Sequence, residues 1–113
     1  MSNEQLTWTD FEKVEIRTGT IVAVEAFPQA RKPAYKLTID FGPLGTKRTS
    51  AQLTVLYHPD ELVGKQVVAV VNFPPKQIAT FMSECLVLGA VADDGTVTLL
   101  QTERSTTNGL RIA

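Results

Sequence analysis

The stretch AYKLTIDF, residues 34–41, alternates strictly between apolar and polar side chains. In an extended chain the two kinds fall on opposite faces, with Tyr35, Leu37, Ile39 and Phe41 on one and Lys36, Thr38 and Asp40 on the other. This period of two is typical of a strand that has one face in a core and the other in water. Glycines at 42 and 45 predict a turn, and residues 47–56 alternate again, with Ala51, Leu53 and Val55 apolar. The sequence therefore predicts a β-hairpin of two half-buried strands.

Further strands are predicted on both sides of this hairpin. Residues 13–26 predict a long strand, in which Gly19 is expected at a bulge or at a sharp bend. Residues 66–71, QVVAVV, are nearly all apolar and predict a strand in the middle of the fold. Residues 85–91 and 96–100 predict the remaining strands, separated by a turn at Asp93-Asp94-Gly95.

Two short helices are predicted as well. Thr9 and Glu12 have the spacing of a capping box, and Pro59 to Val63, followed by Gly64, has proline and glycine where a helix begins and ends. The second helix falls between the third and fourth strands, which is the arrangement of the five-stranded Greek-key barrel called the OB fold. We therefore predict an all-β OB-fold barrel with short helices and terminal extensions. A small β-sandwich is the alternative.

Length and composition limit the classes of function. The chain has 113 residues, enough for one domain, and its 11 basic and 12 acidic residues give a net charge of -1, which argues mildly against a nucleic-acid binder. Its one cysteine cannot form an intramolecular disulfide, and no apolar run approaches the roughly 18 residues of a membrane span. The N-terminus lacks a signal-peptide pattern. We expect a cytoplasmic protein that does not insert into a membrane.

The usual constellations of catalytic residues are missing from the sequence. One histidine, His58, and one cysteine, Cys85, cannot build a typical zinc site, and no glycine-rich phosphate-binding motif occurs. The adjacent carboxylates fall at a helix start and at a turn, where acids are common anyway. We expect no enzyme, no metal site and no cofactor.

Basic residues are concentrated in the middle of the chain. Between residues 31 and 76 three acids are outnumbered by seven bases, which are Arg31, Lys32, Lys36, Lys47, Arg48, Lys65 and Lys76. The predicted hairpin would bring Lys36, Lys47 and Arg48 together near one end, as a local positive patch that attracts phosphates. The alternative is an ordinary solvated face of the hairpin, which charge alone slightly favours.

The connection between residues 72 and 83 is long for so small a barrel, and it borders the binding face in OB folds. Pro74 and Pro75 stiffen it, and Ile78, Phe81 and Met82 give it apolar anchors. Asn72 and Ser83 could supply hydrogen bonds and Lys76 a phosphate contact. Alternatively, the apolar residues cap the open end of the barrel, and both roles can hold together.

Three aromatic residues are candidate platforms for stacking bases. Trp8 and Phe11 flank the expected capping box, so packing of the short helix is favoured for them. Tyr57 ends a predicted strand, and its sequence context favours neither role.

Several strings resemble one known family. DFEKVEIRTGTI (10–21), LVGKQVVAVVNF (62–73) and the loop from Asn72 to Ser83 are similar to the tRNA-binding OB domain, which occurs free-standing and appended to bacterial methionyl-tRNA synthetases. KPAYKLTIDFG (32–42) and LVLG (86–89) resemble the CsaA group of that family, small proteins described as protein-export chaperones. The wider family carries Gly-Met where this chain has Cys85 and Leu86, a departure that the CsaA group shares.

The resemblance implies a homodimer formed by terminal extensions, here residues 1–11 and about 101–113. We accordingly expect a dimerising extension at 1–9, the tRNA-binding domain at 10–92 and a second extension at 93–113. The first hypothesis is non-catalytic recognition of folded tRNA by shape, through Lys36, Lys47, Arg48, Asn72, Lys76 and Ser83. The alternative is an export chaperone that binds unfolded pre-proteins through an apolar groove, either at the dimer interface or beside Ile78, Phe81 and Met82, with the secretion motor as a further partner. A subunit that delivers tRNA to a synthetase is a third possibility.

Overall fold

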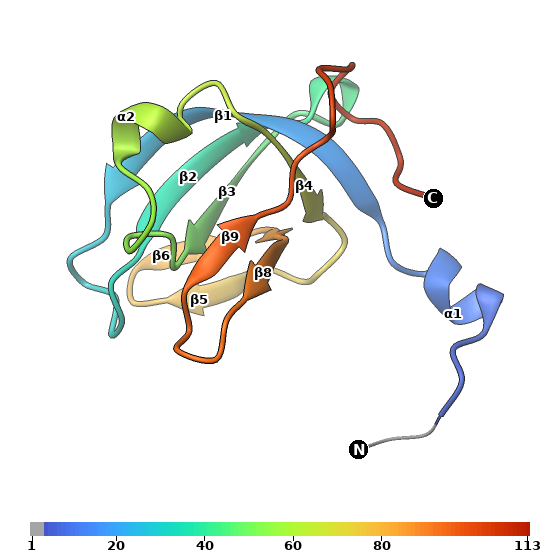
Figure 1. Ribbon diagram of the computed structural model, residues 1–113, viewed down its shortest axis with the longest axis horizontal. Helices are drawn as coiled ribbons and strands as arrows, with labels where there is room; N and C mark the ends of the chain where they lie inside the picture. The colour runs from blue at the N-terminus through green and yellow to red at the C-terminus, as the bar shows by residue number, and fades with distance from the viewer. Residues whose placement is uncertain (1–3) are drawn as a thin grey trace.

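Five antiparallel strands wrap into a nearly closed barrel in the computed structural model, which describes residues 4–113 (Figure 1). The first three residues of the expected N-terminal extension lie outside that range. The barrel strands run in the order β3-β2-β1-β4-β7, and two small two-stranded sheets, β5-β6 and β8-β9, lie beside them. The elements are α1 (Trp8–Glu12), β1 (Ile16–Ala26), β2 (Tyr35–Asp40), the 3-10 helix η1 (Gly42–Leu44), β3 (Thr46–Ala51), α2 (Pro59–Leu62), β4 (Gln66–Val70), β5 (Lys76–Ile78), β6 (Phe81–Ser83), β7 (Leu86–Val87), β8 (Gly89–Val91) and β9 (Val97–Leu99). The prediction of an all-β, OB-like fold is confirmed.

The hairpin that the alternating pattern predicts is formed by β2 and β3. Leu37 pairs with Thr49 across it, and Leu37, Ile39 and Phe41 are completely buried. The second strand is shorter than predicted, because β3 ends at Ala51 and the chain then enters a turn. Val55 lies in that turn and is 74% exposed, so its expected place on the core face was wrong.

Gly19 marks a close approach rather than a bulge. It lies within β1 in regular pairing with Val67, and a Cβ atom there would come within 2.7 Å of Ile39 Cγ2 and of the Phe41 ring. The irregularity of β1 lies further on, between Ile21 and Ala23. Glycine at position 19 therefore lets the Phe41 side chain pack directly against the backbone of β1.

The two α-helices are as short as the sequence predicts, but the first begins earlier. Thr7, not Thr9, caps α1, since its Oγ1 accepts a hydrogen bond from the Asp10 N–H at 3.1 Å. The second helix, α2, begins at Pro59 as predicted, and the Glu61 carboxylate accepts a hydrogen bond from the His58 N–H at 2.8 Å. No helix of residues 4–113 is long and apolar enough to cross a membrane.

The C-terminal segment, residues 107–112, lies along β1 and is held there by hydrogen bonds. The buried Thr18 is its main anchor: its Oγ1 donates to the Thr107 carbonyl at 2.8 Å and accepts from the Leu110 N–H at 2.9 Å. The backbone adds bonds from the Gly109 N–H to the Thr18 carbonyl and from the Ile112 N–H to the Ile16 carbonyl. The end of the chain is therefore an ordered part of the barrel wall.

Candidate nucleic-acid interface

The loop that the sequence singles out folds into the β5-β6 hairpin at one end of the barrel (Figure 1). Ile78 and Phe81 pack with Phe27 and Ala34 in a small apolar cluster separate from the main core. Ser83 fixes the hairpin to β3, because its Oγ lies 3.0 Å from Thr49 Oγ1 and accepts a hydrogen bond from a backbone N–H of β3. The hairpin is thus docked through Ile78 and Phe81, whereas Met82 is 46% exposed, and a capping role of these residues at the open end of the barrel stays a prediction.

Two of the predicted cations meet at the β6 side of this hairpin. The Lys36 Nζ lies 4.9 Å from the Phe27 ring centroid and 5.4 Å from that of Phe81, and the Arg48 guanidinium carbon lies 4.8 Å from the Phe81 centroid. Cation–π contacts of this kind hold a charged side chain in place without neutralising it. Arg48 also forms an exposed ion pair with Glu25 at 3.5 Å, which a phosphate would have to displace.

Lys47 does not join this pair. It pairs with Ile39 across the hairpin, whereas Arg48 pairs with Thr38, and successive side chains of a strand point to opposite faces. The structure therefore brings together two of the three cations expected in one patch, Lys36 and Arg48, and places Lys47 on the other face of the same strand.

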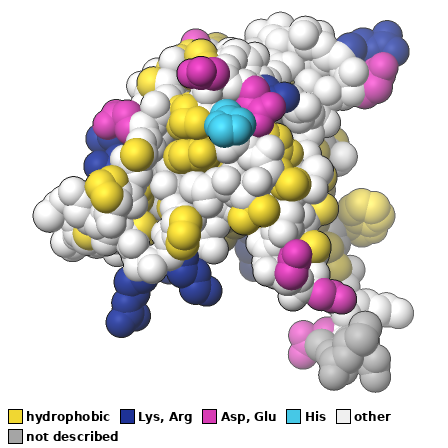
Figure 2. Space-filling view, turned by 60° about the vertical axis from the view of Figure 1, so that its left-hand side comes forward, with side chains coloured by type: hydrophobic (Ala, Val, Ile, Leu, Met, Phe, Trp, Pro, Cys, Tyr) yellow, Lys and Arg dark blue, Asp and Glu magenta, His cyan; other side chains and the backbone are white. Residues whose placement is uncertain are grey.

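A second basic side lies along β5. Lys76 lines an open hollow together with Arg31 and Lys32 of the β1–β2 loop and with Ser50 and Gln52. Arg31 and Lys32 belong to the basic stretch of the sequence, but no motif there separated them from the other bases. Lys and Arg side chains project from the lower edge of the molecule in Figure 2, away from the apolar patch around its single histidine.

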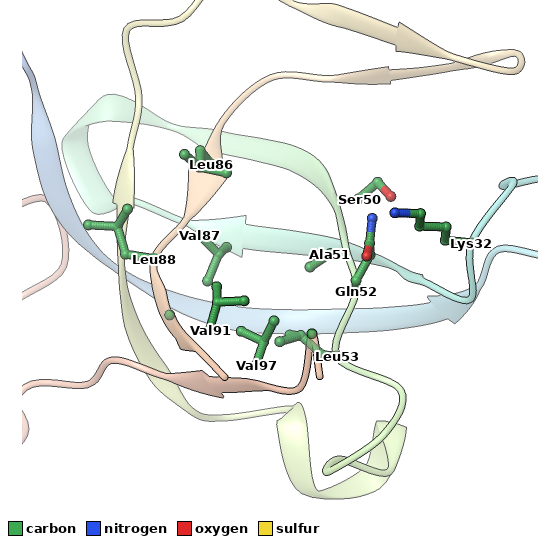
Figure 3. A pocket seen from close by; sticks show the side chains of 12 residues that line it. Lys32, Ser50, Ala51, Gln52, Leu53, Leu86, Val87, Leu88, Val91 and Val97 are labelled. Carbon is green, nitrogen blue, oxygen red and sulfur yellow. The ribbon is translucent and has the colours of Figure 1, made fainter. Parts of the chain in front are cut away.

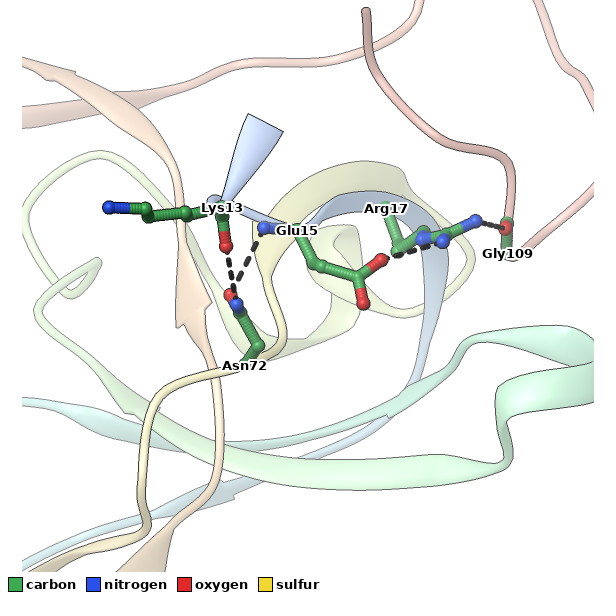
Figure 4. Close-up of polar contacts among 5 residues, drawn as sticks. All are labelled: Lys13, Glu15, Arg17, Asn72 and Gly109. Carbon is green, nitrogen blue, oxygen red and sulfur yellow. Dashed lines mark hydrogen bonds and ion pairs between the residues drawn. The ribbon is translucent and has the colours of Figure 1, made fainter. Parts of the chain in front are cut away.

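Asn72 is already engaged within the protein (Figure 4). Its Oδ1 accepts a hydrogen bond from the Glu15 N–H at 3.0 Å, and its Nδ2 donates to the Lys13 carbonyl at 2.7 Å. Beside it the Glu15 carboxylate pairs with Arg17 at 2.6 Å, and Arg17 also donates to the Gly109 carbonyl. Asn72 therefore ties the segment before β1 to the end of β4, while one N–H and one lone pair of its exposed amide stay available.

An apolar groove runs from β3 to the β8-β9 sheet (Figure 3). It has a volume of about 530 Å³, and Lys32, Ser50 and Gln52 lie at one end of it. Its apolar part is lined by Leu53, Leu86, Val87, Leu88, Val91 and Val97. A second apolar hollow lies beside Ile78 and is lined also by Phe73, Pro74 and Leu86, of which Phe73 and Leu86 are 54% and 48% exposed.

Cys85 and Tyr57 serve the core. Burial raises the pKa of the Cys85 thiol to about 12, so the thiol stays protonated at neutral pH and its sulfur is a poor nucleophile. The Tyr57 hydroxyl accepts a hydrogen bond from the Leu99 N–H at 3.0 Å while its ring packs against the core, so it is not a free stacking platform. Among residues 4–113 no three His, Cys, Asp or Glu side chains converge as metal ligands do.

Trp8 contradicts the expectation that it packs the first helix. Its side chain is 84% exposed, and with Leu6, Phe11 and Ala113 it lines an open apolar hollow at the end of the molecule opposite the β1–β2 loop. None of the residues of α1 is buried.

Comparison with known proteins identifies the family of the chain. Residues 16–111 match the family described as "Putative tRNA binding domain". The chain belongs to this tRNA-binding domain family. Solved structures similar to it include the chaperone CsaA from Bacillus anthracis (49% identity, TM-score 0.93, covering 97% of this chain and all of that one) and the CsaA chaperone protein from Picrophilus torridus (52%, 0.88, 96% and all). A MetRS-related protein from Pyrococcus horikoshii is 26% identical with a TM-score of 0.86, over 97% of this chain and 99% of that one.

Curated relatives of this tRNA-binding domain are much longer enzymes. The methionine–tRNA ligases of Methanococcoides burtonii and Sorangium cellulosum are 36% and 34% identical over 92% and 96% of this chain. The chain spans only 15% of the length of either ligase. The family is a tRNA-binding domain and not a catalytic one.

Proposed function

We propose that this tRNA-binding domain binds folded tRNA through the cations around the β5-β6 hairpin and carries out no chemistry itself. The observation that carries the proposal is the pair Lys36 and Arg48, held against the buried Phe81 ring and followed on the other side of the hairpin by Lys76. Family membership supplies the ligand class. Asn72 and Ser83 contribute from the borders of this surface, mainly by fixing its shape, whereas Lys47 lies on the other face of β3 and is left out of the proposed site.

Charge distribution, rather than net charge, makes this binding favourable. The chain as a whole carries a net charge of -1, so long-range attraction to RNA is weak. Locally, five cations lie around one small hairpin, and phosphates that they contact release counterions. Binding of this kind weakens steeply as salt rises, and it reads backbone geometry rather than base sequence.

Fluorescence anisotropy of labelled mixed tRNA at several salt concentrations tests the proposal. We expect binding in the micromolar range or tighter, poor competition by duplex DNA, and roughly ten-fold weaker binding by a Lys36→Glu, Arg48→Glu variant with unchanged circular dichroism. The matched control is Lys13→Glu, Arg104→Glu, which changes the net charge equally at exposed cations outside the hairpin surface. Equal losses in both variants, or no tRNA binding at low salt, would reject the proposed site.

The exposed N-terminal end supports a homodimer. A five-residue helix does not persist alone in water, and α1 lies apart from the barrel with Leu6 71% and Trp8 84% exposed (Figure 1). We propose that a second copy covers this apolar hollow, which would give the assembly two hairpin surfaces for one folded RNA.

A second candidate function is favoured by the apolar groove of Figure 3. Two similar solved structures are those of CsaA chaperones, and an accessible apolar groove with a lysine at one end suits an unfolded polypeptide. We propose it as an alternative or additional activity of a cytoplasmic protein, with unfolded pre-proteins and the secretion motor as partners.

Replacing Val91 tests the groove. Val91 lines it and is 69% exposed, so a Val91→Ser variant should fold normally but bind a hydrophobic dye and an unfolded polypeptide several-fold more weakly. Val55→Ser is the matched control, since Val55 is 74% exposed in a turn and does not line the groove. Identical dye and polypeptide binding by both variants would exclude the groove as the site.

A further inference from the structure

The β5-β6 hairpin has cations along both of its edges. Lys76 lies on β5 and faces Arg31 and Lys32 across an open hollow. On the β6 side, Lys36 and Arg48 line a separate hollow with Phe81, Met82 and Glu84, whose carboxylate accepts a hydrogen bond from the Arg48 backbone N–H. We call these the β5 flank (Arg31, Lys32, Lys76) and the β6 flank (Lys36, Arg48). A single phosphate backbone that follows one flank leaves the other unused.

We propose that the hairpin inserts into the minor groove of double-stranded A-form RNA, so that the two flanks contact the phosphates of the two opposite strands. The proposal rests on the tRNA-binding function above and specifies which part of a folded RNA is bound, namely a base-paired stem. It accounts for both flanks with one ligand.

Dimensions favour the minor groove of RNA over that of DNA. Two paired strands lie about 4.8 Å apart, and side chains add width on both sides. The A-form minor groove is wide and shallow and displays 2′-hydroxyls, whereas that of B-DNA is only about 6 Å wide. A hairpin therefore reaches the floor of the RNA groove while its flanking cations stay level with the phosphates.

The turn at the tip of the β5-β6 hairpin is small enough to approach the floor of the RNA minor groove. Ala79 and Thr80 form a two-residue turn between the paired Ile78 and Phe81, and both turn residues are small and exposed. Gln77 donates from Nε2 to the Ala79 carbonyl at 3.0 Å, which steadies the turn and leaves its Oε1 free to accept a hydrogen bond from a 2′-hydroxyl.

Stacking of unpaired bases has little support on this surface. The rings of Phe27 and Phe81 are 4% and 5% exposed, and the cations of the β6 flank already lie over them. Single-strand binders instead present open aromatic faces to successive bases. Phe73 is 54% exposed and lines a hollow with Lys76, so it is the ring through which a single strand could still be held.

Competition against labelled tRNA tests the inference, with three unlabelled competitors of equal length: a 16-base-pair RNA duplex, its single strand and the DNA duplex of the same sequence. We expect the RNA duplex to compete within a few-fold of tRNA, and the other two at least ten-fold less well. Two double variants remove charge from one flank each: Lys32→Gln with Lys76→Gln on the β5 flank, and Lys36→Gln with Arg48→Gln on the β6 flank. Each double variant should lower the salt slope for the RNA duplex by about two, and the quadruple variant should lower it by about four. Phe73→Ala should leave duplex binding unchanged.

The outcomes separate this inference from the proposed function. Binding of tRNA with no competition by the RNA duplex overturns the inference and leaves tRNA binding intact, as does a salt slope that depends on one flank alone. If the single strand competes better than the duplex, and the Phe73→Ala variant binds tRNA much more weakly, the protein binds an unpaired segment of the RNA rather than a stem. No tRNA binding at low salt overturns both.

Discussion

A Phe41→Ala variant is expected to unfold with a free energy about 3–5 kcal/mol below that of the parent protein. Phe41 is completely buried and belongs to the main core, so removal of its ring leaves a cavity where the strands of the barrel meet. Small domains have about 5–15 kcal/mol of stability, so the loss is a large part of the total. Urea unfolding followed by far-ultraviolet circular dichroism measures it. Leu44→Ala, at a residue 47% exposed in η1, is the control and should cost less than about 1 kcal/mol.

A double-mutant cycle tests whether position 19 requires glycine because of the Phe41 ring. Gly19→Ala alone should destabilise by about 1–3 kcal/mol, because its new Cβ would lie 2.7 Å from the Phe41 ring. When Phe41→Ala has removed that ring, the new methyl group has room on that side, so the double variant should lose less than the sum of the single losses. Strict additivity would mean that the clash with Ile39 Cγ2, also at 2.7 Å, decides the cost.

Trp8→Ala is expected to convert a dimer into a monomer at micromolar concentration. Tryptophan side chains at the centre of an interface often carry about 2 kcal/mol or more of binding free energy, which corresponds to a dissociation constant raised roughly 30-fold. Trp8 is the most exposed of the large apolar residues described, and it lines a hollow with Leu6 and Phe11. Sedimentation velocity over a concentration series measures the effect.

Val91→Ala provides the control for this experiment, because Val91 is also exposed but lies on the β8-β9 sheet. It should sediment as the parent protein does. A parent protein that stays monomeric at high concentration, or a Trp8→Ala variant as dimeric as the parent, would contradict the proposed dimer interface.

Short-range patterns predicted most of the fold. Alternation over residues 34–41 predicted β2 with the correct buried face, and Pro59 and Gly64 bracketed α2. The wrong predictions concern residues whose role depends on a contact with a residue far away in the sequence. Gly19 was interpreted as a bulge or a sharp bend, because the Phe41 ring that requires glycine there is brought to it only by the folded barrel. Thr7 and Thr9 are equally good caps in isolation, and only the path of the chain selects Thr7.

The candidate site was less predictable than the fold. The sequence singled out Lys36, Arg48 and Lys76, which surround one hairpin, but it also grouped Lys47 with them although strand pairing puts it on the other face. Arg31 and Lys32 were missed as site residues because they lie in a loop, where no periodicity tells which way a side chain points. For Asn72, residue type suggested a ligand contact, while its partners at Glu15 and Lys13 are 57 and 59 residues away.

The hydrogen bonds of Thr18 also bear on the order in which the protein folds. Thr18 lies in the first strand, and its partners at Thr107 and Leu110 are 89 and 92 residues further along. During synthesis, the Thr18 hydroxyl and the backbone groups at the start of β1 stay without these partners until residues 107–112 have left the ribosome. Contacts of such high sequence separation slow folding. The barrel is therefore expected to close late, and a nascent chain halted before residue 107 should be open to proteases along β1.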